Sequence, residues 1–425
     1  MPTRSALLPS GLLRLLPVVL LGCFAVASAR AEDWPRFRGP QGTGLSAETG
    51  LLKQWPAGGP KLDWKAKGLG TGYSGVSVAA GRIYTMGDGE GSAHLHALVE
   101  KTGEKVWSVP VGPTGGDPSN KYPGTRCTPT VDGALIYATG QWGDLICVEA
   151  ANGKEVWRRN LAKDFKGKMM SKWGYSESPL IDGDRLICTP GGVEGTMIAL
   201  NKKTGAVIWR STDWKDNAAY SSVQIATIGG VRQYVQMTDA SVAGINPADG
   251  KVLWKAPRSG RTAVIPNPII DGDFVYVTSG YGIGCNLFKI TAAGGKLSAE
   301  QVYANKGIVN HHGGVVKVGD NLVGFSDGTG WVWQNMKTGE VTFKTDMKAL
   351  GKGSIAGADG MLYLRFEGRP GTIVLLDASS PEWNEKGRFD PSDRSDKNAW
   401  PHPVIANGRL YIRDQEVLLA FNVKR

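Results

Sequence analysis

The chain contains 425 residues, of which 41% are hydrophobic and 21% are charged, and both proportions are those of an ordinary globular protein. This composition excludes a disordered chain and a membrane protein with several spans. The formal net charge of +10 favours anionic partners, but without clustering of the basic residues it does not indicate nucleic-acid binding.

Residues 1–31 have the pattern of an export signal. A basic start is followed by an apolar stretch and by Ala-Arg-Ala, a small-x-small cleavage sequence that predicts a mature chain beginning at Glu32. Arg14 and Pro17 interrupt the apolar stretch, which is therefore too short for a transmembrane anchor. The sequence Leu-Leu-Gly-Cys ending at Cys23 resembles a lipoprotein box, so a lipid anchor is the alternative. Either way, we expect a monomeric mature chain outside the cytoplasm, with no transmembrane segment.

Glycine is unusually frequent, because 59 residues are about 14% of the chain, about twice the usual share. Without a Gly-x-y period, this excess predicts many tight turns between short strands. One pattern recurs along the chain: a short apolar strand, an Asp-Gly-type turn, two further apolar strands, a Thr-Gly or Asp-Gly turn, and a strand that ends in an aromatic residue. The first-turn glycines, 41 to 52 residues apart, are Gly81, Gly133, Gly183, Gly230, Gly272, Gly319, Gly360 and Gly408.

Each repeat predicts one blade of a β-propeller. The turn dipeptides supply the positive backbone angles that hairpins need. Four short strands form a sheet with two faces to bury, and radial stacking of neighbouring sheets covers both faces. The aromatic residues that end the repeats are expected to pack in the blades: Trp64, Trp107, Trp157, Trp209 and Trp254, followed by Tyr303, Phe343 and Phe389.

The expected fold is all-β, an eight-bladed propeller of four-stranded blades over residues 61–425. Seven blades are the alternative, because the sixth and seventh repeats are degenerate. The last repeat lacks its fourth strand, and residues 61–66 match a closing strand, so we expect this N-terminal strand to complete the last blade and remove the open edges. Residues 32–60, which contain Trp-Pro-Arg-Phe-Arg-Gly-Pro at 34–40, are expected to form an extra arm packed on the ring.

The predicted mature chain has four cysteines. They form no CxxC or CxxCH pattern, which excludes the sequence signatures of a zinc ribbon, a redox pair and a covalently attached haem. We expect Cys127, Cys147, Cys188 and Cys285 to be small buried side chains. One disulfide in an oxidising compartment is the alternative.

A resemblance to a known family rests on the repeat Ala-Leu-Val-Glu-Lys-Thr-Gly-Glu-Lys-Val-Trp at 97–107, which returns at 199–209 and, more loosely, at 244–254. It resembles the repeat of pyrroloquinoline-quinone (PQQ) dehydrogenases and their non-catalytic relatives, which include the propeller lipoprotein of the outer-membrane barrel-assembly machinery. The arm and Trp-Gly-Tyr-Ser-Glu-Ser-Pro at 173–179 further resemble exported PQQ-like proteins of planctomycetes and similar bacteria. The resemblance covers nearly the whole mature chain and implies the fold more than the function, because the tryptophan is a packing device.

A candidate pocket follows from the expected fold. In a propeller, the loops that lead from the outer strand of one blade to the inner strand of the next surround the central channel, and a concave mouth with polar and aromatic groups is a candidate binding site. Its mixed charges suit a small anionic or polyhydroxylated ligand, while ion pairs that only lock the channel are the alternative. The candidate residues are Arg126, Lys172, Trp173, Tyr175, Glu177, Asn267, His311, His312, Lys352, Trp400 and His402.

Two functions are compatible with the sequence. The first is an exported, non-catalytic binding or scaffolding propeller of the bacterial cell envelope, whose partner is an envelope protein or a small ligand, with no cofactor and no nucleic acid. The second, which the resemblance implies, is a PQQ- and calcium-dependent dehydrogenase that oxidises alcohols or sugars. It would use Glu177 and Asn267 as calcium ligands and stack Trp173 or Trp400 on the cofactor. The resemblance implies an adjacent Cys-Cys pair below the cofactor, which alcohol dehydrogenases of the family usually carry. This chain has no such pair and no haem motif, which favours the first function. No catalytic residue is assigned.

Overall fold

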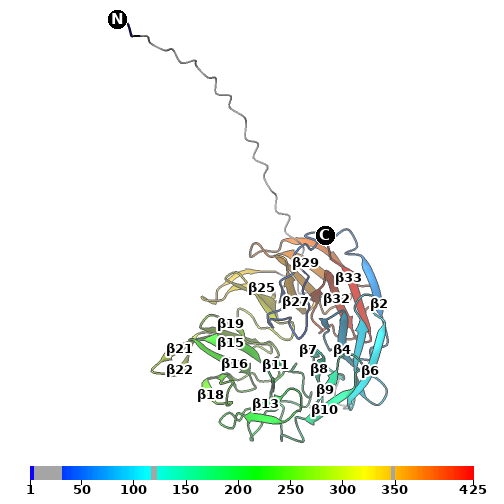
Figure 1. Cartoon of the computed structure of the whole chain (residues 1–425), viewed down its shortest axis with the longest axis vertical. Helices are drawn as coiled ribbons and strands as arrows, with labels where there is room; N and C mark the ends of the chain where they lie inside the picture. Colours follow the sequence, from blue (N-terminus) through cyan, green and yellow to red (C-terminus); the bar gives the residue numbers. More distant parts are fainter. Residues whose placement is uncertain (4–30, 116–121, 346–349) are drawn as a thin grey trace.

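The computed structural model describes residues 1–3, 31–115, 122–345 and 350–425. The strands of these segments form eight sheets that stand as blades around a common centre, in an all-β propeller (Figure 1). Eight blades are therefore confirmed, and the seven-bladed alternative is wrong. Within the described residues, no helix is long and apolar enough to cross a membrane. The predicted export signal falls almost wholly outside the described residues and stays a prediction.

Each of the first four blades is an antiparallel meander whose strands follow one another from the centre of the ring to its rim. Its first hairpin turns on a glycine with positive φ, such as Gly133 at 56°. In chain order, the strands are β3 (Ser77–Ala79), β4 (Arg82–Asp88), β5 (Ala93–Val99), β6 (Lys105–Gly112); β7 (Thr130–Asp132), β8 (Leu135–Thr139), β9 (Asp144–Glu149), β10 (Glu155–Asn160); β11 (Leu180–Asp182), β12 (Arg185–Cys188), β13 (Ile198–Asn201), β14 (Val207–Arg210); and β15 (Gln224–Ile228), β16 (Val231–Met237), β17 (Ser241–Ile245), β18 (Val252–Pro257).

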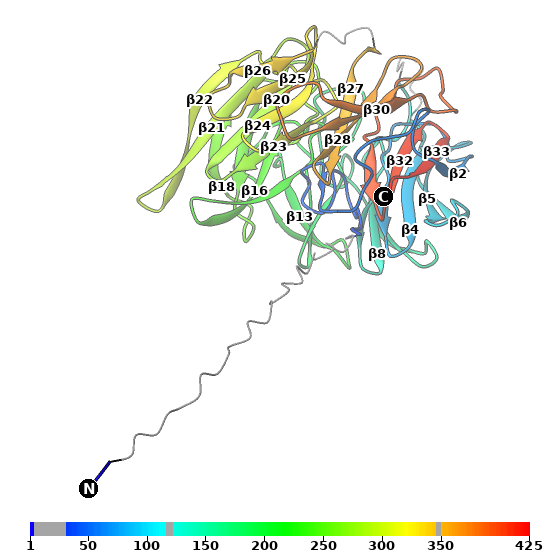
Figure 2. The same cartoon turned by 90° about the horizontal axis from the view of Figure 1, so that it is seen from above.

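The last four blades keep the same order of strands. The N-terminal region adds a fifth strand to the seventh blade and supplies the outer strand of the eighth. Their strands are β19 (Ile269–Asp271), β20 (Phe274–Ser279), β21 (Gly284–Ala293), β22 (Lys296–Asn305); β23 (Val315–Val318), β24 (Asn321–Ser326), β25 (Gly330–Asn335), β26 (Val341–Lys344); β1 (Leu45–Ser46), β27 (Gly353–Ala358), β28 (Met361–Phe366), β29 (Ile373–Asp377), β30 (Glu385–Phe389); and β31 (Val404–Ala406), β32 (Arg409–Asp414), β33 (Val417–Asn422), β2 (Leu62–Ala66). The long β21–β22 hairpin projects from the ring (Figure 2).

The ring is closed by the N-terminal strand, as predicted. β2 pairs antiparallel with β33, and the two strands, blue and red in Figure 1, lie side by side. The arm also supplies a turn contact for this closure: Gly59, at φ +90°, lies so close to Phe389 that an added Cβ would be 2.4 Å from its ring. The two ends of the chain therefore rebuild together the blade that neither could form alone.

The closing tryptophans join neighbouring blades through the indole N–H, which donates to a backbone carbonyl of the next blade. These bonds, of 2.8 to 3.1 Å, run from Trp64 to Glu100, from Trp107 to Ala150, from Trp157 to Lys202 and from Trp209 to Pro247. The turn glycine of the next blade lies under the ring, and a Cβ on Gly205 would be 2.8 Å from Trp157. Trp254 differs, because its indole N–H donates to Gln233 of its own blade.

The arm, residues 32–60, also crosses the centre of the ring. On one side, Trp34 forms a backbone bridge with Val78 of β3. On the far side, the Arg38 guanidinium donates to the carbonyl of Val315, at the start of β23, and β1 adds a parallel fifth strand beside β27. The arm therefore spans the central channel between the inner strands of distant blades.

The four cysteines are structural. Cys127, Cys147, Cys188 and Cys285 are buried and free, as the sequence predicts, and the disulfide alternative is not formed among them. Burial raises the pKa of the Cys127 thiol to about 12, so this thiol stays protonated and unreactive at neutral pH.

Candidate functional site

A cavity of about 340 Å³ lies at the centre of the ring. Every one of the eight loops that connect an outer strand to the next inner strand contributes to its wall, and the arm supplies the floor through Trp34, Phe37 and Arg38. The volume is that of a pocket for a small organic molecule. One wall residue from each loop, in chain order, is Tyr73, Tyr122, Trp173, Tyr220, Ala263, His311, Lys352 and Trp400.

Seven of the eleven candidate pocket residues line this cavity, namely Arg126, Trp173, His311, His312, Lys352, Trp400 and His402. The other four, Lys172, Tyr175, Glu177 and Asn267, lie outside its wall. Tyr175 is buried in the blade, where its hydroxyl donates to the Pro190 carbonyl over 2.9 Å. Loop position therefore predicts the neighbourhood of the cavity, whereas the direction of each side chain depends on its local hydrogen bonds.

Trp400 lies within a cluster of aromatic rings on one side of the cavity. Its ring centroid is 4.2 Å from that of Tyr73, 5.1 Å from that of Tyr122 and 5.6 Å from that of His312. The Arg126 guanidinium lies 5.8 Å from the Tyr73 ring centroid. Flat apolar surfaces of this kind hold planar rings and the C–H faces of sugars.

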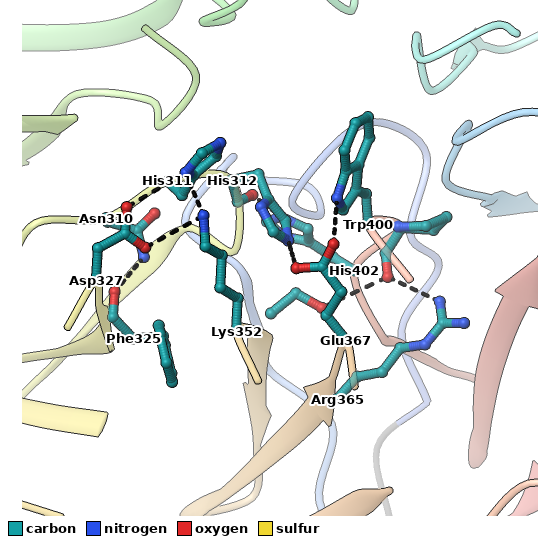
Figure 3. Close-up of polar contacts among 12 residues, drawn as sticks. Asn310, His311, His312, Phe325, Asp327, Lys352, Arg365, Glu367, Trp400 and His402 are labelled. Carbon is teal, nitrogen blue, oxygen red and sulfur yellow. Dashed lines mark hydrogen bonds and ion pairs between the residues drawn. The ribbon is translucent and has the colours of Figure 1, made fainter. Parts of the chain in front are cut away.

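A charged group occupies another side of the cavity (Figure 3). The Lys352 ammonium lies 2.6 Å from Nδ1 of His311 and 3.5 Å from the Asp327 carboxylate. Burial opposes ionisation of Asp327, but its hydrogen bond with His311 and the Lys352 charge hold the pKa of this carboxyl below its usual value. Asp327 is therefore ionised and fixes the Lys352 ammonium at the cavity wall.

Glu367 links the aromatic and the charged sides (Figure 3). Its carboxylate accepts the Trp400 indole N–H over 2.9 Å and lies 3.8 Å from Nε2 of His312. Burial, reinforced by the nearby His311 and Lys352, lowers the pKa of His312 well below its usual value. The His312 ring is therefore neutral, and its contact with Glu367 is not an ion pair.

The floor of the cavity is held by the arm. Nε2 of His402 lies 3.0 Å from the His312 carbonyl, and Nδ1 faces the Arg38 guanidinium at 3.5 Å. Burial and the Arg38 charge lower the pKa of His402 to about 3, so its ring is neutral, and the carbonyl contact assigns its proton to Nε2. Arg38 also donates to the backbone carbonyls of Thr43 and Val315, which stabilise its charge, and it forms no ion pair with a carboxylate among the described residues.

The predicted calcium ligands do not fit a calcium site. The Glu177 carboxylate accepts hydrogen bonds from the backbone N–H and hydroxyl of Thr189 and from the Gln236 amide, over 2.7 to 3.2 Å. The Asn267 carbonyl oxygen accepts the backbone N–H of Ser222. Among the described residues, no three His, Cys, Asp or Glu side chains gather in a group that could hold a metal ion. A hard cation would have to displace these donors, so the residues present are poor ligands for it.

Glu177 instead predicts a pH dependence of stability. Burial raises the pKa of Glu177 to about 8, although the Thr189 hydrogen bonds oppose this shift. The folded chain therefore holds the Glu177 proton more tightly than the unfolded chain, whose carboxyl titrates near 4.5. Its contribution is complete below pH 4.5 and is lost as the pH rises through about 8. Melting temperatures from pH 5 to 8.5 should fall in the natural chain and fall less in Glu177→Gln. Equal slopes would contradict this assignment, and the exposed Glu104→Gln is the matched control.

Sequence reasoning missed several wall residues. Tyr281 and Glu367 follow the second strands of their blades, in hairpins that end on the same face as the loops that were considered. Tyr73 belongs to the loop between β2 and β3. This loop also connects an outer strand to an inner strand, so the rule used for the other loops would have included Tyr73. Arg38 gives no such signal, because only the path of the arm through the ring brings it to the cavity.

Comparison with known proteins agrees with this architecture. A family model described as outer membrane protein assembly factor BamB matches residues 91–345, which is more than half of the chain. BamB of Shewanella oneidensis is 24% identical over 267 residues, 60% of this chain and 64% of the relative. The quinoprotein alcohol dehydrogenase PedH of Pseudomonas putida is 22% identical over 321 residues, 73% of this chain and 48% of the relative. The chain thus spans less than two thirds of the length of these curated relatives.

The fold similarity extends over more of the chain than these alignments. The quinohemoprotein alcohol dehydrogenase of Comamonas testosteroni aligns with a TM-score of 0.62 at 12% identity, over 94% of this chain and 82% of that structure. At this identity, the similarity concerns the fold alone. Together with the family match and the repeated docking tryptophans, it shows that the chain belongs to the PQQ-like β-propeller repeat family, which includes the BamB assembly factors and the quinoprotein alcohol dehydrogenases.

Proposed function

We propose that the protein is an exported, non-catalytic binding propeller of the bacterial cell envelope that holds a small ligand in the central cavity. The observation that carries this proposal is the cavity itself, which has about 340 Å³ and is walled by side chains from all eight connecting loops. A channel that served only to pack the blades would be filled by its own side chains. The distant similarity to BamB supports an envelope location.

The wall indicates the chemistry of the ligand. Tyr73, Tyr122 and Trp400 offer flat surfaces for a ring or a sugar face. The wall and floor carry three basic side chains, Arg38, Arg126 and Lys352, and the carboxylate of Glu367, while Asp327 lies behind the wall and pairs with Lys352. Counting both carboxylates, the basic side chains exceed them by one positive charge. A small anionic or polyhydroxylated molecule with one ring fits both features.

The dehydrogenase alternative has less support. Relatives such as PedH are quinoprotein alcohol dehydrogenases, but Glu177 and Asn267 of this chain accept hydrogen bonds from protein donors and lie outside the cavity wall. Without calcium, PQQ is one planar anionic ring among others that suit the cavity, so its binding alone does not indicate a dehydrogenase. PQQ with calcium is therefore a decisive comparison ligand for the binding experiment.

Trp400→Ala is expected to weaken ligand binding by about tenfold or more, because it removes the ring at the centre of the aromatic cluster. The probe is 8-anilinonaphthalene-1-sulfonate, an aromatic anion whose fluorescence reports binding, and it is displaced with gluconate, galacturonate and PQQ. Trp383→Ala is the matched control, since this tryptophan lies outside the cavity and its indole N–H donates to Glu385. Lys352→Met should reduce the affinity for anions more than that for neutral sugars.

Three outcomes would overturn the proposal. The first is probe binding that is equal in Trp400→Ala and in the natural chain. The second is the absence of saturable binding by any of these ligands. The third is PQQ binding that requires calcium, is lost in Glu177→Gln and supports dye-linked oxidation of alcohols or sugars, which would assign a quinoprotein dehydrogenase.

A further inference from the structure

Glu48 is a buried carboxylate at the base of the arm. It is 1% exposed. One carboxylate oxygen accepts the backbone N–H of Glu32 over 2.9 Å, and the other accepts the backbone N–H of Gly408, in the first hairpin turn of the last blade, over 3.0 Å. Glu48 therefore ties the beginning of the arm to the blade that closes the ring.

The charge of Glu48 is poorly compensated in the unprocessed chain. Burial raises its pKa, although the backbone N–H groups and the more distant Lys424 ammonium lower it. No ion pair to Glu48 is formed among the residues that the structure describes. A buried carboxylate without a cationic partner is costly, so a positive charge placed beside it would stabilise the fold.

We propose that hydrolysis of the Ala31–Glu32 peptide bond creates an α-ammonium group that pairs with Glu48. An export peptidase would catalyse the step, in which water adds across the bond. The hydroxyl of water joins the Ala31 carbonyl carbon and the remaining hydrogen joins the Glu32 nitrogen. The new carboxylic acid then gives its proton to this amine, which leaves a carboxylate on Ala31 and an α-ammonium on Glu32. No other reactant is required. This processing site does not depend on the identity of the ligand.

Glu32 is already held where the new amino group is needed. Its own carboxylate accepts the backbone N–H of Ala47 over 2.6 Å, so the residue is fixed from its side chain as well as from its nitrogen. A second cavity, of about 150 Å³, lies beside this contact and is lined by Ala31, Glu48, Gly408 and Lys424. It leaves room for the two N–H bonds that the ammonium gains.

The pairing would couple export to completion of the ring. The amide N–H of Glu32 already donates to Glu48, and replacement of this donor by an ammonium turns a neutral hydrogen bond into a charge-assisted one. The strengthened contact holds the arm, and therefore the cavity floor, against the last blade. The mature protein would thus be more stable than its precursor.

The first experiment identifies the mature terminus and then probes its amino group. The full chain is expressed with its own leader in a Gram-negative host, and the intact mass of the exported protein is measured. The expected terminus is Glu32. Acetylation by an N-hydroxysuccinimide ester at pH 7, followed by peptide mass spectrometry, then compares the rate at this amine with that at the exposed Lys337.

The α-amine should react about tenfold faster in Glu48→Gln than in the natural chain, because the loss of one unit of pKa elevation raises the reactive fraction tenfold. Glu104→Gln, which removes an exposed carboxylate, should leave the rate unchanged. If Glu48→Gln is not secreted, the acetylation rate at the α-amine is instead compared between the folded natural chain and the natural chain unfolded in urea. A terminus at Cys23 or elsewhere, or equal rates with and without the Glu48 charge, would overturn the proposal.

Discussion

Deletion of residues 32–66 should leave an open ring that aggregates and loses its cooperative unfolding transition. The deletion removes β2 from the last blade and exposes the backbone edge of β33. It also removes Gly59 from beneath Phe389 and takes away the floor of the cavity. Size-exclusion chromatography and calorimetry of the deleted chain measure the effect.

A peptide of residues 32–66 provides the control for this deletion. Added to the truncated chain, it should restore part of the melting transition, since the missing strand pairs through its backbone with β33. A deleted chain that stays monomeric and melts at the temperature of the full chain would refute closure by the N-terminal strand.

Trp157→Ala should destabilise the protein by about 3–5 kcal/mol, the cost of emptying a large buried aromatic site. The Trp157 side chain is 8% exposed, covers Gly205 of the next blade and donates to the Lys202 carbonyl over 2.8 Å. The change therefore leaves a cavity at the seam between two blades as well as an unpaired carbonyl. Urea unfolding at constant pH measures the loss.

Trp157→Phe separates the two contributions. Phenylalanine keeps most of the ring over Gly205 but cannot donate a hydrogen bond, so we expect a loss of about 1 kcal/mol from the missing bond, with a smaller addition from the lost volume. Similar losses in Trp157→Phe and Trp157→Ala would show that ring packing between the blades contributes little.

Much of the fold could be predicted because each blade is specified locally. A Thr-Gly or Asp-Gly turn followed by a strand ending in tryptophan determines the hairpin, and the partner of that tryptophan is the same turn one repeat later. Gly205 and Trp157 illustrate this relation. Repeats that lack the closing tryptophan keep the pattern with another aromatic residue: in the fifth blade, Tyr303 donates to the Met336 carbonyl of the next blade through its hydroxyl.

The site was less predictable because loop position gives the face of the ring but not the direction of each side chain. Lys352 and Trp400 point to the cavity, whereas Glu177 turns away to accept hydrogen bonds from Thr189 and Gln236. Gln236 belongs to the next blade, 59 positions away, and its contact with Glu177 gives no local sequence signal, so the residue type alone suggested a metal ligand. Glu367 was missed for a related reason, because its hairpin lies outside the connecting loops that were considered.

The course of the arm was beyond sequence reasoning. Its motif at 34–40 was expected to pack on the ring, but only the tertiary structure shows that Arg38 reaches the far side of the channel and donates to the Val315 carbonyl. No local periodicity specifies such a contact, since the two residues are 277 positions apart.

The arm across the channel has a consequence for how a ligand would come and go. A ring open at both ends would let solutes pass through, whereas here Trp34, Phe37 and Arg38 of the arm lie across the channel and line the cavity. The residence time of a ligand would then depend on the loops that form the rest of the wall. Most of the cavity wall comes from loops rather than from the strands that pack one blade on the next, so substitutions in these loops can change ligand preference while the repeats stay the same.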